Sequence, residues 1–157
     1  MGKLPYLESL TITDFSSLKV IGREFLGIND HNNEAEFVSF PELVKLEIDS
    51  CTLLEGWEDL KPEDEGRITV MPKLEAIRIR GCKKFTKLPF WLHLKLSSLK
   101  ELELDDGNFI LQSEQLENGI LSALPQCPSL GSLNIQKYEA TKLPNWLMYE
   151  ATTNIQE

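Results

Sequence analysis

The segment "MPKLEAIRIRGCKKFTKLPFWL", residues 71–92, combines two apolar spacings that decide the fold. Its first apolar residues after the proline are Leu74, Ile77, Ile79 and Cys82, separated by gaps of 3, 2 and 3 residues. A spacing of two is typical of a strand, whose side chains alternate between faces, whereas a helix would repeat at about 3.6 residues. The segment therefore predicts a short strand around Ile77 and Ile79, entered through Leu74 and left through Cys82.

The same pattern, apolar-(Pro/Ser)-x-Leu-x-x-(Leu/Ile)-x-(Leu/Ile), occurs five times in the chain of 157 residues. The leading leucines are 36, 31, 25 and 31 residues apart. One such unit cannot bury its own apolar edge, but stacked units can, and this is the signature of a repeat architecture. The five units are "LPYLESLTI" from Leu4, "FPELVKLEI" from Phe40, "MPKLEAIRI" from Met71, "LSSLKELEL" from Leu96 and "CPSLGSLNI" from Cys127.

We therefore predict a single domain over residues 1–157, an α/β solenoid of about five irregular leucine-rich repeats. A concave parallel sheet would line one side, with loops and short helices on the convex side. The strand residues expected to point into the core are Leu10 and Ile12, Leu46 and Ile48, Ile77 and Ile79, Leu102 and Leu104, and Leu133 and Ile135. A further inward residue is expected three positions after each strand, at Phe15, Cys51, Cys82, Gly107 and Tyr138.

The segments between the strands differ from one another. Residues 113–125 carry apolar residues at helical spacing and are predicted to form a helix on the convex side. The turns "KLPFWL" (87–92) and "KLPNWL" (142–147) are expected to place a tryptophan, Trp91 or Trp146, over the rim of the core. Polar residues 27–37 and the charged run 58–67 are predicted to be surface loops that lengthen the first two repeats.

Composition excludes several classes of function. The formal net charge of −9 opposes a nucleic acid or an anionic membrane as partner, because both favour a basic surface. No apolar run is long enough for a membrane span, and the N-terminal residues lack the apolar core of a signal peptide. Three cysteines without a Cys-x-x-Cys pair fit a reducing compartment, so we expect a cytoplasmic protein.

Catalytic, cofactor and metal sites are not predicted. Gly22 and Gly27 have the glycine spacing of a phosphate loop, but the Lys-Ser/Thr pair that should follow is missing. His31 and His93 have no nucleophile at a motif spacing. The successive cysteines Cys51 and Cys82 point the same way on neighbouring strands, so they are expected to be buried apolar fillers, not a disulfide or half of a zinc site.

The outward strand positions are free of the packing constraint and form the candidate recognition surface. In register, Arg78 is expected between Glu47 and Glu103, and Arg80 between Asp49 and Asp105. Two interpretations remain open, a charge ladder that holds the strands in register, or an acidic surface with a central basic stripe that recognises a partner protein. The candidate protein-binding residues are Lys45, Glu47, Asp49, Arg78, Arg80, Glu101, Glu103, Asp105, Asn134 and Gln136, with Ser9, Thr11, Thr13, Ala76 and Ser132 completing the outward rows.

Several segments resemble the C-terminal leucine-rich repeats of plant intracellular nucleotide-binding leucine-rich-repeat immune receptors of the coiled-coil class. They are "LPYLESLTITDFSSLKVIGREFLG", "FPELVKLEIDSC", "MPKLEAIRIRGCKKFTKLPFWL" and "CPSLGSLNIQKY" followed by "KLPNWL". The resemblance covers residues 4–148 and implies a non-catalytic module of disease resistance. Its partner would be a pathogen effector, a guarded host protein or the receptor's own nucleotide-binding domain, whose switch it would restrain. ATP or ADP binding is not implied, because the phosphate loop and the coiled coil are missing.

Two other classes were weighed. A substrate-receptor domain of a ubiquitin ligase also carries cysteine-bearing leucine-rich repeats, but would have a preceding F-box-like helical segment and more regular repeats. An extracellular receptor would have a signal peptide, paired cap cysteines and glycan sites. Because the chain starts inside a repeat with no polar cap before Leu4, we expect a fragment of a longer receptor that associates with itself through its ends.

Overall fold

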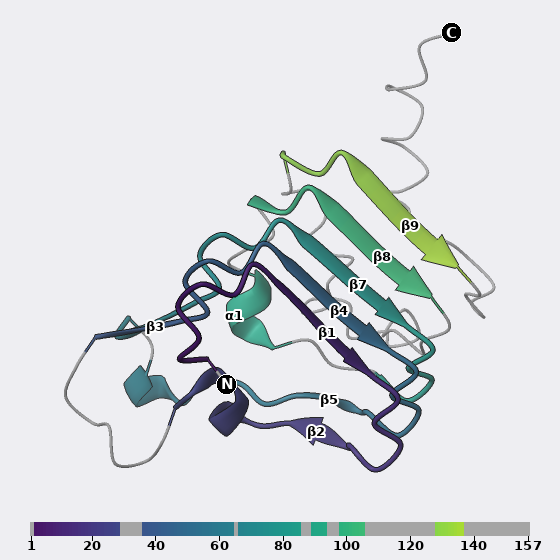
Figure 1. Cartoon of the computed structure of the whole chain (residues 1–157), viewed down its shortest axis with the longest axis horizontal. Coiled ribbons are helices and arrows are strands. Elements are labelled where there is room, and N and C mark those ends of the chain that lie inside the picture. Colours follow the sequence, from purple (N-terminus) through teal and green to yellow (C-terminus); the bar gives the residue numbers. More distant parts are fainter. Residues whose placement is uncertain are drawn as a thin grey trace, which may run out of the picture.

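A five-stranded parallel sheet dominates the computed structural model, which describes residues 2–28, 36–64, 66–85, 89–93, 98–105 and 128–136 (Figure 1). The order of the strands in the sheet follows their order in the chain, so each strand pairs with the next. This order agrees with the predicted parallel sheet. The strands are β1 (Ser9–Thr13), β4 (Lys45–Asp49), β7 (Ala76–Arg80), β8 (Glu101–Asp105) and β9 (Ser132–Gln136).

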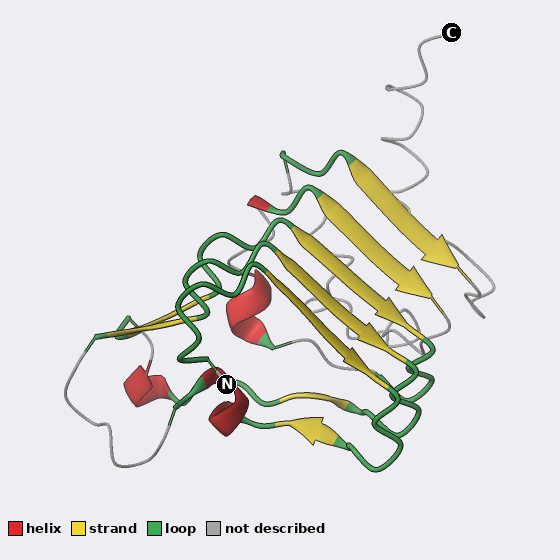
Figure 2. Cartoon of the chain, in the orientation of Figure 1, coloured by secondary structure: helices red, strands yellow, loops and turns green. Residues whose placement is uncertain are grey.

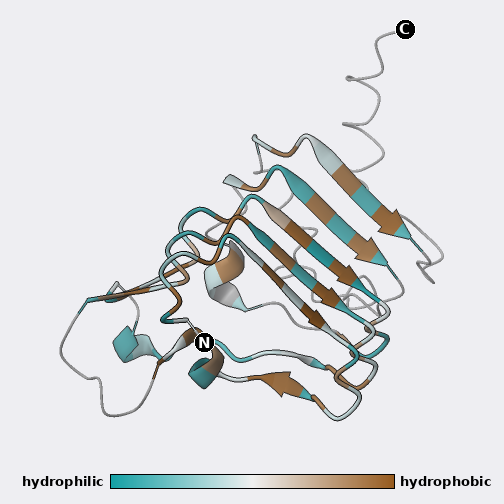
Figure 3. Ribbon diagram, in the orientation of Figure 1, coloured by the Kyte–Doolittle hydropathy of each residue, from teal (hydrophilic) through white to brown (hydrophobic). Residues whose placement is uncertain are grey.

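The strand register aligns apolar residues across the whole sheet. Leu46 lies opposite Leu10 and Ile77, and Ile48 lies opposite Ile12 and Ile79. Alternation of apolar and polar side chains along each strand is visible as banding in Figure 3. The inward residues of the three central strands are fully buried, as predicted, whereas Leu10 on β1 and Leu133 and Ile135 on β9 are only partly buried because these strands are the edges of the described sheet.

The same backbone hydrogen bonds recur where the chain enters each strand. The Glu8 carbonyl accepts from the N–H groups of Val44 and Lys45, at 2.8 and 3.1 Å. Val44, Glu75 and Lys100 carbonyls each accept from two successive amides in the same way. Where the strands end, Asp14, Ser50 and Gly81 occupy corresponding positions with φ angles of 60°, 55° and 60°. The chain therefore turns identically after β1, β4 and β7.

Two short parallel pairings that the sequence did not predict extend the contact between residues 2–39, the first segment, and residues 40–70, the second segment (Figure 2). Strand β2 (Val20–Ile21) pairs with β5 (Gly56–Trp57), at an offset of 36 residues. Strand β3 (Phe37–Ser39) pairs with β6 (Ile68–Val70), at an offset of 31 residues. The stretch from β2 to β3 is thus five residues longer than the corresponding stretch from β5 to β6.

Helices are few and short in the described residues: η1 (Arg23–Leu26), η2 (Pro62–Asp64) and α1 (Phe90–His93). None of these is long and apolar enough to cross a membrane. In Figure 1, α1 lies behind the main sheet. The predicted helix at 113–125 lies outside the described residues, as do Gly107, Cys127, Tyr138, Trp146 and His31.

Aromatic rings fill the core below the sheet. The rings of Trp57 and Trp91 meet edge to face with centroids 5.6 Å apart, and Phe25 contacts both Trp57 and Phe40. Trp91 was expected to cover the rim, but its side chain is buried within this cluster. Sequence reasoning did not single out Trp57, because no repeated motif marks it.

Gly2 anchors the start of the first segment. Its N–H donates to the Phe25 carbonyl and its own carbonyl accepts from the Phe40 N–H, both at 2.9 Å. A Cβ at this position would lie 1.9 Å from the Leu26 carbonyl oxygen. Only glycine fits this close approach of two backbone segments.

Phe15 contradicts the prediction that it points into the core, because 57% of it is exposed. Cys51 and Cys82 hold the corresponding positions and are fully buried. A thiol fills a small site between neighbouring segments, whereas Phe15 follows the edge strand β1 and no described segment packs over it.

The two predicted loops are also partly structured. The charged run 58–67 contains η2, and Asp64 within it is buried instead of solvated. In the stretch 27–37, Gly27 and Ile28 are buried and Phe37 begins β3, while residues 29–35 lie outside the described part. Both surface assignments are therefore wrong at these positions. The polar composition of a segment indicates that most of its residues are solvated, but it does not identify the few that are buried.

Candidate protein-binding face

The outward side chains of the five strands form one continuous surface, here called the polar face. None of its residues is fully buried, which agrees with the predicted outward positions. The formal charges are concentrated on the three central strands, while the outward residues of β1 and β9 are uncharged. The face consists of Ser9, Thr11, Thr13, Lys45, Glu47, Asp49, Ala76, Arg78, Arg80, Glu101, Glu103, Asp105, Ser132, Asn134 and Gln136.

Arg78 is the centre of the charged network on this face. Its guanidinium lies 3.2 Å from a Glu47 oxygen on β4 and 2.6 Å from a Glu101 oxygen on β8, with Glu103 at 3.5 Å. The backbone register places Arg78 opposite Glu47 and Glu103, as predicted. One cation therefore joins three strands.

Arg80 departs from the predicted pairing. Its backbone is opposite Asp49, as expected, but its guanidinium holds both carboxylate oxygens of Glu103, from Nε at 2.9 Å and Nη2 at 2.6 Å. The prediction placed Arg80 between Asp49 and Asp105. The pairing is diagonal because strand side chains lean along the strand and a long arginine reaches the acid one pleat away.

The electrostatics of the face follow from these contacts. Hydrogen bonds from Arg80 lower the pKa of Glu103 below its ordinary value, against the opposing effect of partial burial. Partial burial likewise works to raise the pKa of Glu47, but hydrogen bonds from Lys45 and Arg78 outweigh it and the net shift is downward. Carboxylate partners raise the pKa of Arg78 and Arg80. These shifts keep Glu47, Glu103 and both arginines in their charged forms at neutral pH.

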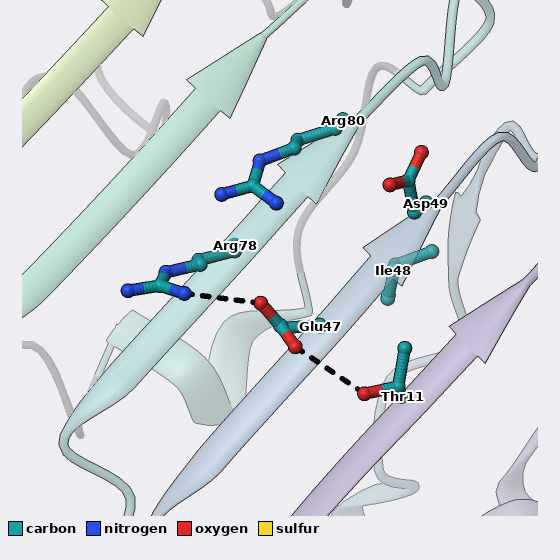
Figure 4. A pocket seen from close by; sticks show the side chains of 6 residues that line it. All are labelled: Thr11, Glu47, Ile48, Asp49, Arg78 and Arg80. Carbon is teal, nitrogen blue, oxygen red and sulfur yellow. Dashed lines mark hydrogen bonds and ion pairs between the residues drawn. The ribbon is translucent and has the colours of Figure 1, made fainter.

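A shallow pocket lies on the polar face between β1, β4 and β7 (Figure 4). Glu47 stands at its centre, where it accepts from the Thr11 hydroxyl at 3.3 Å and from Arg78. Its volume is about 60 Å³, whereas pockets for small ligands enclose roughly 300 Å³ or more. The pocket is therefore too small for a typical small-molecule ligand. Thr11, Glu47, Ile48, Asp49, Arg78 and Arg80 line it.

A second charged cluster, which the sequence analysis missed, lies away from the polar face. Asp64 is ion-paired with Arg23 of the first segment and with Arg67, the latter at 3.3 Å. The side chain of Asp64 is 6% exposed and that of Arg23 is 12% exposed. The sequence does not show that Asp64, and not the neighbouring Glu63, is the buried acid, because only the fold brings Arg23 close to Asp64.

Cys51 and Cys82 occupy the predicted sites as free, buried thiols. Cys51 donates to the Asp49 carbonyl at 3.5 Å and Cys82 to the Arg80 carbonyl at 3.2 Å. Burial raises the pKa of Cys82 to about 11, which disfavours the reactive thiolate. Within the described ranges, no three His, Cys, Asp or Glu side chains are grouped so as to hold a metal ion.

No protein-family model, curated protein or solved structure matches this chain.

Proposed function

We propose that this chain is a protein-recognition module built as a leucine-rich-repeat solenoid, and that the polar face is its binding surface. The recurring hydrogen bonds at the strand entries and the matching φ angles of Asp14, Ser50 and Gly81 support the repeat interpretation. So do the offsets of 36 and 31 residues between paired strands, which equal the sequence spacings of the predicted repeats. Each repeat would contribute one strand to a concave sheet.

The observation that carries the proposal is the partly exposed ion-pair network on a continuous sheet face. Its arginines are about a quarter to a third exposed. Exposed pairs contribute little to stability, so a partner's charges can replace them at small cost. Charge complementarity of this kind sets the specificity and the rate of association.

The biological setting that we propose is plant immunity. The irregular repeat lengths and the sequence pattern of the repeats support this setting. The module would recognise a pathogen effector or a guarded host protein in the cytoplasm, or would hold the receptor's own nucleotide-binding domain inactive. In this setting the chain is non-catalytic and needs no cofactor. Recognition would use the charged central strands, with the uncharged edge strands as a rim.

Capture experiments with charge-reversed variants test this proposal. The variant R78E/R80E reverses both arginines of the polar face and changes the net charge by −4. The control K73E/K100E makes the same change at Lys73 and Lys100, which lie in the turns before β7 and β8 and pair with Glu42 and Glu75. Circular dichroism and thermal melts confirm folding, and R78Q/R80Q replaces the reversal if that variant is unstable.

We expect a specific protein from leaf extract, identified by mass spectrometry and re-tested in purified form, to bind the wild type and the control but not the polar-face variant. Equal binding by all three proteins would show that the arginines are only a ladder that holds the strands in register. The recognition proposal for this face would then be rejected.

A further inference from the structure

The exposed large apolar side chains of the described residues are confined to the first segment. They are Leu4, Tyr6, Phe15, Val20 and Val38, between 45% and 88% exposed. Single exposed apolar residues are ordinary, so these side chains indicate an interaction surface only together with the strand edge beside them. The second segment, which has the same architecture, shows none among its described residues because the first segment packs against it.

The backbone of the first segment is also open on that side. Strands β1, β2 and β3 each pair on one side only, with β4, β5 and β6, in the described part of the chain. An unpaired strand edge presents free N–H and C=O groups, and proteins usually protect it with charges or proline. Strand β1 reads Ser-Leu-Thr-Ile-Thr and has neither, whereas each of the three central strands carries at least two charges.

We propose that a second copy of this chain pairs with this edge, β1 against β1 in antiparallel orientation, about a two-fold axis at Thr11. In this register Ser9 lies opposite Thr13 of the second copy, and Thr11 lies opposite its own equivalent. Leu10 lies opposite Ile12 of the second copy, and both side chains point toward the core. Hydroxyl pairs and apolar pairs of this kind favour strand association.

The residues flanking β1 extend the match and select a second copy as the occupant. The same axis brings the residues that enter β1, Leu7 and Glu8, beside the turn after β1 of the second copy, where Phe15 is exposed. One pair opposes association, because Glu8 falls opposite Asp14 of the second copy, and symmetry repeats this contact. The dimer is therefore weak at low salt and tightens as added salt screens the acids. The inference concerns the strand edge and does not depend on the proposed function.

Sedimentation velocity of the full 157-residue chain tests the proposal. Protein concentrations of about 1–500 μM cover the dissociation constants expected of a weak dimer with a small interface. The wild type should show a monomer–dimer equilibrium that tightens between 50 and 500 mM salt, as roughly expected from screening. T11K opposes two lysines across the axis and should weaken the dimer about tenfold or more. F15S, at an exposed position that tolerates a polar residue, should also weaken it.

Two further variants make the test specific to this register. E8K replaces each Glu8–Asp14 repulsion by an ion pair, so it should tighten the dimer and remove the dependence on added salt. T52K adds a lysine at an exposed position of the second segment and should leave the dimer unchanged. A strict monomer at every concentration, growth beyond a dimer, or equal effects of T11K and T52K would each overturn the proposal.

Discussion

The molecule has two clusters of arginines and carboxylates, and they differ in burial. In the buried cluster, Asp64 joins Arg23 and Arg67, and the side chains of Asp64 and Arg23 are 6% and 12% exposed. On the polar face, the side chains of Arg78 and Arg80 are 26% and 36% exposed. The residue types are the same, but water reaches only one of the clusters freely.

This difference determines what each cluster can do. The buried ion pair connects η1 of the first segment to η2 of the second, and the backbone N–H of Arg23 also donates to Glu58 at 3.1 Å. Removing one partner would leave an uncompensated charge in a site with little water. Water reaches the polar-face pairs, so breaking one of them should cost the fold little.

The largest expected effect is at the buried cluster. D64A should lower the free energy of unfolding by about 3 kcal/mol, because it breaks the ion pair of the mostly buried Arg23. Urea denaturation monitored by circular dichroism measures the change. E63A, which removes an exposed carboxylate from the same short helix, is the control and should cost only a few tenths of a kcal/mol. Similar losses in both variants would show that burial of the Asp64 carboxylate does not determine its contribution to stability.

A smaller effect is expected on the polar face, where a double-mutant cycle can resolve the diagonal pairing. The coupling between R80A and E103A should be about 0.5–1 kcal/mol and should decrease at high salt. The matched cycle combines R80A with D49A. Arg80 and Asp49 are opposite in the backbone register, but the Arg80 guanidinium donates its hydrogen bonds to Glu103. The coupling in this matched cycle should be clearly smaller. Equal couplings would mean that register alone, and not the two-point contact, sets the interaction.

The smallest effect concerns pH. The pKa of Glu103 is lowered in the folded state, so its contribution to stability is present above the ordinary pKa of 4.5 and is lost as the pH falls through the folded value. The difference in unfolding free energy between the wild type and E103Q should therefore be larger at pH 6 than in strong acid. Urea titrations from neutral to acid pH measure it, with E63Q as the control for the amide substitution itself. A difference that stays constant with pH would contradict the role of Arg80 in holding Glu103 ionised.

The parallel sheet, its strand order and the polar face could be predicted because they follow from local periodicity. Alternation at a period of two assigns each strand residue to a face, and repetition of one pattern aligns the strands. Hence Leu46 and Ile48 are buried, Arg78 is outward and flanked by Glu47 and Glu103, and Cys51 and Cys82 are buried, as the sequence indicated.

The remaining features depend on contacts between residues far apart in the chain, which carry no local pattern. Asp64 is buried because Arg23, 41 residues away, meets it. The strands β2 and β5 are too short to show a period, and Gly2 is required only because the Leu26 carbonyl passes close to it. Phe15 has the sequence position of a core residue, but it follows an edge strand and is exposed. Arg80 pairs with Glu103 because its long side chain extends diagonally to the next strand. The sequence by itself determined which residues face inward or outward along each strand, since that depends on neighbours in the chain, while the tertiary structure decided what those residues meet.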